Sequence, residues 1–171
     1  MSDSRSDAFI FFGATSDLAY KKIFPSLQAM AKRGTLDVPV IGVARSGWDL
    51  DKFRAGVYDS LEKHGGVDRA AFDKLRNLLR YVEGDYNYPA TFQAIGREIG
   101  SRKHPACYLA IPPVLFGLVV EQLGKSGYAK GARVIFEKPS VLSCREAVMN
   151  EKEENASSVA SIIPVSGGMG C

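Results

Sequence analysis

A glycine-led turn near the N-terminus has the residue types that bind an anionic ligand. The apolar run Ala8–Phe12 leads directly into Gly13-Ala14-Thr15-Ser16-Asp17-Leu18, and the helical pattern that follows carries two lysines, the second of them Lys22. A glycine lets the backbone approach a phosphate, and the free N–H groups at a helix start favour negative charge. The turn therefore predicts a phosphate site for a nucleotide cofactor. It holds only one glycine of the usual G-x-G-x-x-G pattern, so a plain turn with a Thr15 or Ser16 helix cap is an equal alternative.

Arg45 and Ser46 stand where a dinucleotide-binding fold binds the adenosine ribose. They follow the second apolar run, Val38–Ala44, and no acidic residue stands beside them until Asp49. An acidic residue in this place suits the ribose 2′-hydroxyl of NAD, whereas an arginine suits the 2′-phosphate of NADP. The pair favours NADP and leaves NAD open. The separation from Gly13 is longer than usual, and a solvated loop arginine is the alternative.

The elements that must position these residues alternate regularly along the chain. Apolar runs without polar alternation predict strands, and between them lie helical patterns, the first of which contains Pro25 and is expected to bend there. The predicted strands are 8–12, 38–44, 81–82, 106–111 and 132–136, and the predicted helices are 18–33, 50–63, 68–80, 88–102 and 114–124. This order indicates an α/β fold with a Rossmann-like, doubly wound parallel sheet and helices on both faces. Its ligand site lies at the carboxyl ends of the strands, where Gly13, Arg45, Pro112 and Lys138 all fall.

Composition excludes several classes of protein. The chain has 171 residues and a net charge of +3, with no basic run carrying interleaved aromatic residues, which argues against a nucleic-acid partner. Cys107, Cys144 and Cys171 lack C-x-x-C spacing, so neither a disulfide framework nor a metal site is expected. No apolar run approaches the roughly 18 residues of a membrane helix, and the polar N-terminus is no signal peptide. We therefore expect a cytoplasmic protein without a membrane partner.

Residues 140–171 differ in character from the rest of the chain. A charged helix-like piece, Ser143–Asn155, is followed by Ser-rich and Gly-rich sequence, with no further strand–helix unit. We expect residues 8–139 to form the nucleotide-binding domain and residues 140–171 to form a divergent, loosely ordered tail.

Four segments, in order, resemble the glucose-6-phosphate dehydrogenase family. The run GATSDLAYKKIFPSL from Gly13 is similar to the family's N-terminal signature, G-x-x-G-D-L-A-x-x-K-x-x-P, and Gly42–Ser46, Tyr108–Pro113 and Val134–Pro139 agree as well. The resemblance implies oxidation of glucose 6-phosphate at C1 to 6-phosphogluconolactone, with hydride transfer to NADP, in the pentose phosphate pathway. It covers about residues 8–139, the N-terminal NAD(P)-binding domain only.

The resemblance also implies roles for individual residues. The pyrophosphate turn would comprise Gly13, Thr15, Ser16, Asp17 and Leu18; the 2′-phosphate would lie at Arg45 and Ser46, and the nicotinamide at Ala110 and Pro112. Lys22 and Lys138 match the two active-site lysines, and Pro139 matches a proline that is cis in the family. A lysine ammonium is a compact cation that can hold a sugar phosphate or orient a hydroxyl. The alternatives are a basic helix face for Lys22 and a strand-end ion pair for Lys138.

Departures from the family limit what the resemblance implies. Ser16 replaces the second glycine of the signature, and the similarity stops at Pro139, before the substrate-binding RIDHYLGKE segment and the domain with the general-base histidine. The two histidines, His64 and His104, are expected at the surface. We therefore expect a truncated cofactor domain, inactive alone. A free-standing NADP-binding or sensing module, and an unrelated methyltransferase or flavin binder, are the alternatives. Oligomeric state is left open.

Overall fold

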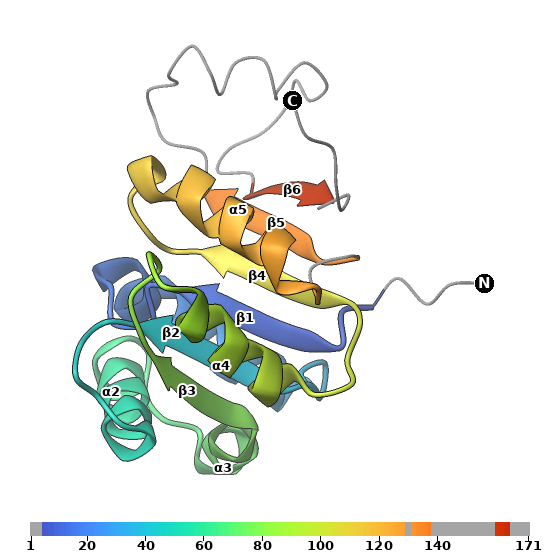
Figure 1. Ribbon diagram of the computed structural model, residues 1–171. Coiled ribbons are helices and arrows are strands. Elements are labelled where there is room, and N and C mark those ends of the chain that lie inside the picture. The colour runs from blue at the N-terminus through green and yellow to red at the C-terminus, as the bar shows by residue number, and fades with distance from the viewer. Residues whose placement is uncertain (1–4, 129–130, 138–159, 165–171) are drawn as a thin grey trace.

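A twisted sheet organises the chain in the computed structural model, which describes residues 5–128, 131–137 and 160–164 (Figure 1). Its strands are β1 (Ala8–Phe12), β2 (Val40–Ala44), β3 (Leu79–Glu83), β4 (Pro105–Leu109), β5 (Arg133–Glu137) and β6 (Ala160–Pro164). In the described residues the order is β3-β2-β1-β4-β5-β6, and β1 to β5 pair in parallel. The predicted doubly wound parallel sheet is confirmed. The strand order reverses between β1 and β4, and ligands bind at such a switch point in open α/β sheets.

Helices cover both faces of the sheet. They are η1 (Ala19–Ile23), α1 (Phe24–Lys32), α2 (Leu50–Lys63), α3 (Arg69–Leu78), α4 (Pro89–Ile99), η2 (Pro113–Leu115) and α5 (Phe116–Ser126). Side chains of η1, α1, α2 and α3 share one buried cluster with alternate residues of the sheet, and those of α4 and α5 share the other. Figure 1 shows α4 and α5 side by side over one face.

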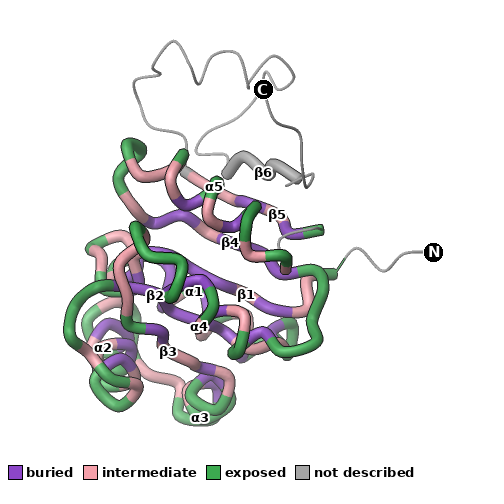
Figure 2. Tube along the Cα trace, in the orientation of Figure 1, coloured by how far each residue is buried: buried purple, intermediate pink, exposed green. Residues whose placement is uncertain are grey.

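Successive side chains of β1 point to opposite faces of the sheet and so pack into the two buried clusters in turn. Phe11 packs with Phe24 of α1 and Phe53 of α2, at ring distances of 5.8 and 6.0 Å for Phe11–Phe24 and Phe11–Phe53. Phe12 points to the opposite face and stacks on Phe92 of α4 at 5.9 Å. Ile10, like both phenylalanines, is fully buried. Figure 2 shows most of β1 as buried. Because β1 is covered on both faces, its sequence is continuously apolar.

Several boundaries differ from those predicted, and two of these differences concern the start of β3 and the end of β4. β3 begins at Leu79, whereas the sequence predicts a helix through residue 80. Leu79 pairs with Val40 in the ladder between β2 and β3, and this pairing favours the extended backbone over the intrinsic helical pattern. β4 ends at Leu109, so Ala110 lies just beyond the strand, where its N–H donates to the Phe12 carbonyl at 2.9 Å.

β6 is a strand that the sequence analysis did not identify. Ala160–Pro164 pairs antiparallel with β5, so that Val134 lies opposite Ile163. The predicted helix-like piece Ser143–Asn155 lies outside the described residues. Across the described part of the chain, no helix has the length and apolar character needed to cross a membrane.

Candidate nucleotide-binding site

Gly13 begins the turn after β1 and lies against the ends of two other strands. Its N–H lies 2.9 Å from the Val43 carbonyl of β2 and 2.9 Å from the Tyr86 hydroxyl. Its φ is +84°, and an added Cβ would stand 2.1 Å from the Ala110 carbonyl oxygen. Glycine is required here because both the backbone conformation and the space exclude a side chain. The turn is therefore held at the switch point between β1 and β4.

Tyr86 is a partner of this turn that the sequence analysis missed. Its hydroxyl accepts the Gly13 N–H and donates to the Val43 carbonyl at 3.2 Å, so one side chain joins the ends of β1 and β2. Burial raises the pKa of Tyr86 to about 12, which keeps the hydroxyl protonated and able to donate. The only signal in the sequence is its position just after the third strand.

Ser16 forms a helix cap. Its hydroxyl accepts the N–H of Ala19 at 3.2 Å, and its own N–H donates to the Gly13 carbonyl at 2.9 Å. The cap that was one alternative for this turn is therefore present. A capping hydroxyl retains its own proton for a further acceptor, so the cap is compatible with an anion at the turn.

The remaining residues of the turn divide between surface and core. Thr15 and Asp17 are exposed, and the Asp17 carboxylate pairs with Lys21 at 2.8 Å. Leu18 is half-buried and packs against the core beneath α1. Lys22 is exposed, with no ion-pair partner among the described residues. Its side chain is therefore accessible from solvent.

The backbone that carries Lys22 is one turn of π-helix, and Pro25 explains it. The Phe24 N–H bonds to the Ala19 carbonyl, five residues back, which leaves the Tyr20 carbonyl without its ordinary α-helical donor. The next donor would be residue 25, which is proline and has no N–H. The predicted bend at Pro25 therefore appears as a change of helix type from η1 to α1.

Ser60 of α2 satisfies the carbonyl that Pro25 leaves open. Its hydroxyl donates to the Tyr20 carbonyl in a short hydrogen bond, and Ser60 is fully buried. The Tyr20 hydroxyl donates to the neighbouring Asp59 carboxylate, which Lys63 also contacts at 3.0 Å. The bond from Tyr20, and then that from Lys63, lower the pKa of Asp59. Two hydrogen bonds between Tyr20 and α2 therefore hold η1 in place, and Lys22 is part of η1.

Replacing Ser60 with alanine is expected to lower the free energy of unfolding by about 1–3 kcal/mol, because the partly buried Tyr20 carbonyl loses its donor. Ser26→Ala is the matched control, since the Ser26 hydroxyl donates to the Lys22 carbonyl at 2.8 Å but is exposed to water. Urea unfolding, followed by tryptophan fluorescence, measures both variants. An equal loss in the two variants would contradict the role given to Ser60.

Arg45 and Ser46 lie beside the end of β3, where two carboxylates meet them. The Arg45 guanidinium pairs with Asp85 at 2.8 Å, although the Arg45 side chain stays 76% exposed. The Glu83 carboxylate accepts the N–H groups of Ser46 at 2.9 Å and of Gly47 at 3.0 Å. The sequence analysis assigned no role to either acidic residue. Their position at a strand end, on the edge shared with Arg45, was the available signal.

The other predicted site residues lie along the same edge or outside the described residues. Ala110 is buried against Gly13, and Pro112 is exposed at the start of η2. Lys138 and Pro139 lie outside the described residues. The structure thus brings together Gly13, Arg45 and Ala110 at the carboxyl ends of neighbouring strands. No group of three or more His, Cys, Asp or Glu residues in the described part of the chain is arranged to hold a metal ion.

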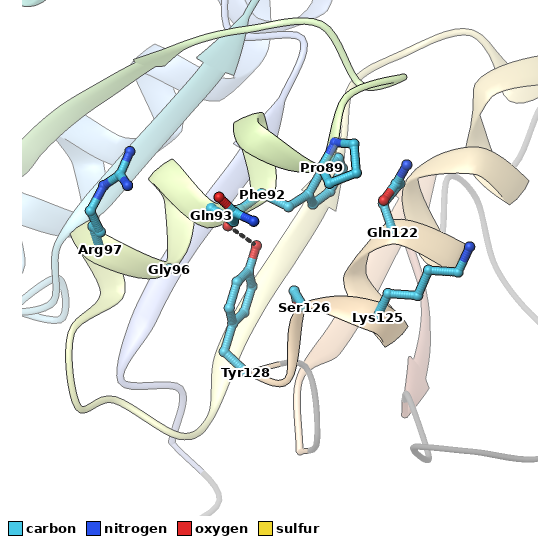
Figure 3. Close-up of a pocket in the computed structure, with 9 residues that line it drawn as sticks. All are labelled: Pro89, Phe92, Gln93, Gly96, Arg97, Gln122, Lys125, Ser126 and Tyr128. Atoms are coloured by element: carbon cyan, nitrogen blue, oxygen red, sulfur yellow. Dashed lines mark hydrogen bonds between the residues drawn. The ribbon is translucent and has the colours of Figure 1, made fainter.

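A pocket of about 440 Å³ lies elsewhere, between α4 and α5 (Figure 3). Tyr128 forms part of its wall, with its hydroxyl donating to the Phe92 carbonyl at 3.1 Å, and Arg97 and Lys125 lie at its two sides. None of the predicted site residues lines this pocket. The predicted site residues therefore lie along an open edge of the sheet and not around this hollow.

The family model described as "Glucose-6-phosphate dehydrogenase, NAD binding domain" matches residues 10–153. The chain belongs to this family. Glucose-6-phosphate 1-dehydrogenase 1 of Mycobacterium tuberculosis is 34% identical over 134 residues, which are 78% of this chain and 29% of that protein. The glucose-6-phosphate 1-dehydrogenase of Dickeya dadantii is 34% identical over 136 residues, 76% of this chain and 28% of that protein. The chain thus spans under a third of the length of these relatives.

Solved structures of the glucose-6-phosphate dehydrogenase family share the fold. The crystal structure of glucose-6-phosphate 1-dehydrogenase from Mycobacterium avium matches with a TM-score of 0.75 and 36% identity, over 78% of this chain and 30% of that one. A glucose-6-phosphate dehydrogenase in complex with glucose 6-phosphate matches with a TM-score of 0.70 and 26% identity, over 84% of this chain and 33% of that one. The sheet edge described above is therefore that of an NAD(P)-binding domain.

Proposed function

We propose that this chain binds NADP as the cofactor domain of a glucose-6-phosphate dehydrogenase. The observation that carries the proposal is Arg45, whose exposed guanidinium follows β2 on the edge that also holds Gly13. A guanidinium can bind a phosphate through two parallel hydrogen bonds, which suits the 2′-phosphate. Family membership supports a dinucleotide, and Arg45 supports NADP over NAD.

The residues of the edge suit the three parts of this cofactor. The turn of Gly13, Thr15, Ser16, Asp17 and Leu18 would hold the pyrophosphate, because Gly13 presents only backbone there. Arg45 and Ser46 would hold the 2′-phosphate. Ala110 and Pro112 would border the nicotinamide beyond β4. NADP, when bound, supplies the acceptor for a hydride.

The substrate of the complete dehydrogenase would be glucose 6-phosphate, oxidised at C1. Lys22 would contact it from η1, where its ammonium is exposed. Lys138 would lie between substrate and nicotinamide, a role that rests on the sequence match alone. Removal of the hydroxyl proton of the sugar needs a general base, and none of the residues proposed for this edge is assigned that role.

Titration with NADP and NAD tests the proposal directly. Arg45→Ala is expected to weaken NADP binding about 10- to 100-fold, because a charge-assisted contact is lost, and to leave NAD binding within about twofold. Trp48, the one tryptophan of the chain, lies in the same loop and reports binding by fluorescence. Arg76→Ala, on the exposed side of α3, is the matched control. Absence of binding to either nucleotide by the wild-type chain would refute the proposal.

A further inference from the structure

Glu83 occupies a cradle of backbone N–H groups in the loop after β2. Its Oε1 accepts hydrogen bonds from Ser46 at 2.9 Å and from Gly47 at 3.0 Å. Successive N–H groups of a turn form a concavity that binds anions, and Gly47, at a φ of +69°, allows that turn. A carboxylate of the chain itself therefore fills an anion site beside Arg45.

Glu83 is held in this place by a residue of its own strand, two positions earlier. The Tyr81 hydroxyl donates to Glu83 Oε2 at 2.7 Å and lies 2.8 Å from the Ser46 hydroxyl. The Tyr81 ring in turn packs on Phe53 at 5.2 Å. Partial burial acts to raise the pKa of Glu83, but the bonds from Tyr81 and from the loop N–H groups outweigh it and lower the pKa. The carboxylate stays ionised at neutral pH.

Asp85 is the second carboxylate at this place, and it engages Arg45 itself. Its Oδ2 lies 2.8 Å from the guanidinium, and its Oδ1 accepts the Asn87 N–H at 2.9 Å. The bonds from Asn87, and then the charge of Arg45, lower the pKa of Asp85. Its side chain is 19% exposed, against 76% for Arg45, so Asp85 is the more enclosed partner of the pair.

We propose that Glu83 and Asp85 narrow the preference of this site for NADP over NAD. The inference rests on the proposed function, because it concerns the place where the 2′-phosphate would lie. A 2′-phosphate carries a charge of about −2 and would compete with Glu83 for the N–H groups and with Asp85 for the guanidinium. A ribose 2′-hydroxyl meets no such repulsion, and it can donate to a carboxylate. The two carboxylates thus oppose the effect of Arg45.

The test measures NADP and NAD dissociation constants for the full 171-residue chain and for the variants Glu83→Gln and Asp85→Asn. Each variant is expected to tighten NADP binding about 3- to 10-fold with little change for NAD, so the ratio of the two constants shifts by that factor. Raising the salt concentration is expected to shrink the shift, since these charges are partly exposed. Glu62→Gln, an exposed residue of α2 with the same change of charge, is expected to leave the ratio unchanged.

The outcomes separate the inference from the proposed function. If the wild-type chain binds neither nucleotide, the proposed function fails and the inference fails with it. If the wild-type chain binds but neither variant changes the ratio, the inference alone is overturned. Equal weakening of NADP and NAD binding in Glu83→Gln would also overturn the inference for Glu83. That result would mean that Glu83 supports the structure of the loop and does not discriminate between the nucleotides. Asp85→Asn provides an independent test should Glu83→Gln fail to fold.

Discussion

Replacement of Gly13 by alanine is expected to lower the free energy of unfolding by more than about 4 kcal/mol, a large share of the roughly 5–15 kcal/mol that stabilises a typical domain. The added Cβ would stand 2.1 Å from the Ala110 carbonyl oxygen and 2.8 Å from its carbonyl carbon. Both are backbone atoms at the end of β4, so no side-chain rotation can relieve the contact. The β1 turn and β4 would have to separate at the proposed cofactor edge.

Gly34→Ala is the control that distinguishes the steric clash at Gly13 from the cost of a positive φ alone. Gly34 also has a positive φ, +73°, but an added Cβ there would meet nothing within 4 Å. Its replacement is expected to cost only about 1–2 kcal/mol, the penalty of the left-handed conformation. Chemical denaturation followed by circular dichroism measures both variants. Losses of similar size would show that close approach to Ala110 does not explain Gly13.

Replacement of Phe53 by alanine is expected to lower the free energy of unfolding by about 3–5 kcal/mol, because a fully buried ring is lost and leaves a cavity. The ring packs against Phe24 at 5.8 Å and Tyr81 at 5.2 Å. It also lies directly on β2, where a Cβ at Gly42 would come within 2.6 Å of it. The cavity would therefore open beneath Tyr81, the residue that holds Glu83 and Ser46.

Two further variants define what the Phe53 result means. Phe53→Leu keeps most of the apolar volume and is expected to lose clearly less stability than Phe53→Ala. Val114→Ala, at a side chain that is 85% exposed, is expected to change stability by no more than about 0.5 kcal/mol. Urea unfolding measures all three. A Phe53→Ala loss as small as that of Val114→Ala would contradict the packing described for this face.

The order of elements could be predicted because central strands such as β1 are covered on both faces. Such strands are continuously apolar, as in Ala8–Phe12, and they are separated by amphipathic helices and turn residues. The same pattern could not predict where β3 begins, because Leu79 is extended only through its pairing with Val40. It also did not reveal β6, whose partner β5 precedes it by more than twenty residues.

Only part of the candidate site could likewise be predicted from the sequence. Gly13 and Arg45 were predicted from their positions after strand ends, which converge on one edge of any parallel sheet, whereas Ala110 was predicted only from the resemblance to the family. The residues that contact them were not predicted, because the sequence does not show which loop the side chain of a residue near a strand end will contact. Glu83 meets Ser46 from 37 positions along the chain, and Tyr86 meets Gly13 from 73.

The fold class, the family and the edge on which a dinucleotide would lie follow from the amino-acid sequence alone, because these depend on local pattern and on short motifs read in order. The electrostatic setting of that edge depends on the tertiary structure. That structure placed Glu83 in the N–H cradle and Asp85 against Arg45, and it made Ser60 the donor for a carbonyl left open by Pro25. Hydrogen bonds act over about 3 Å, so they depend on which distant segments the sheet brings together.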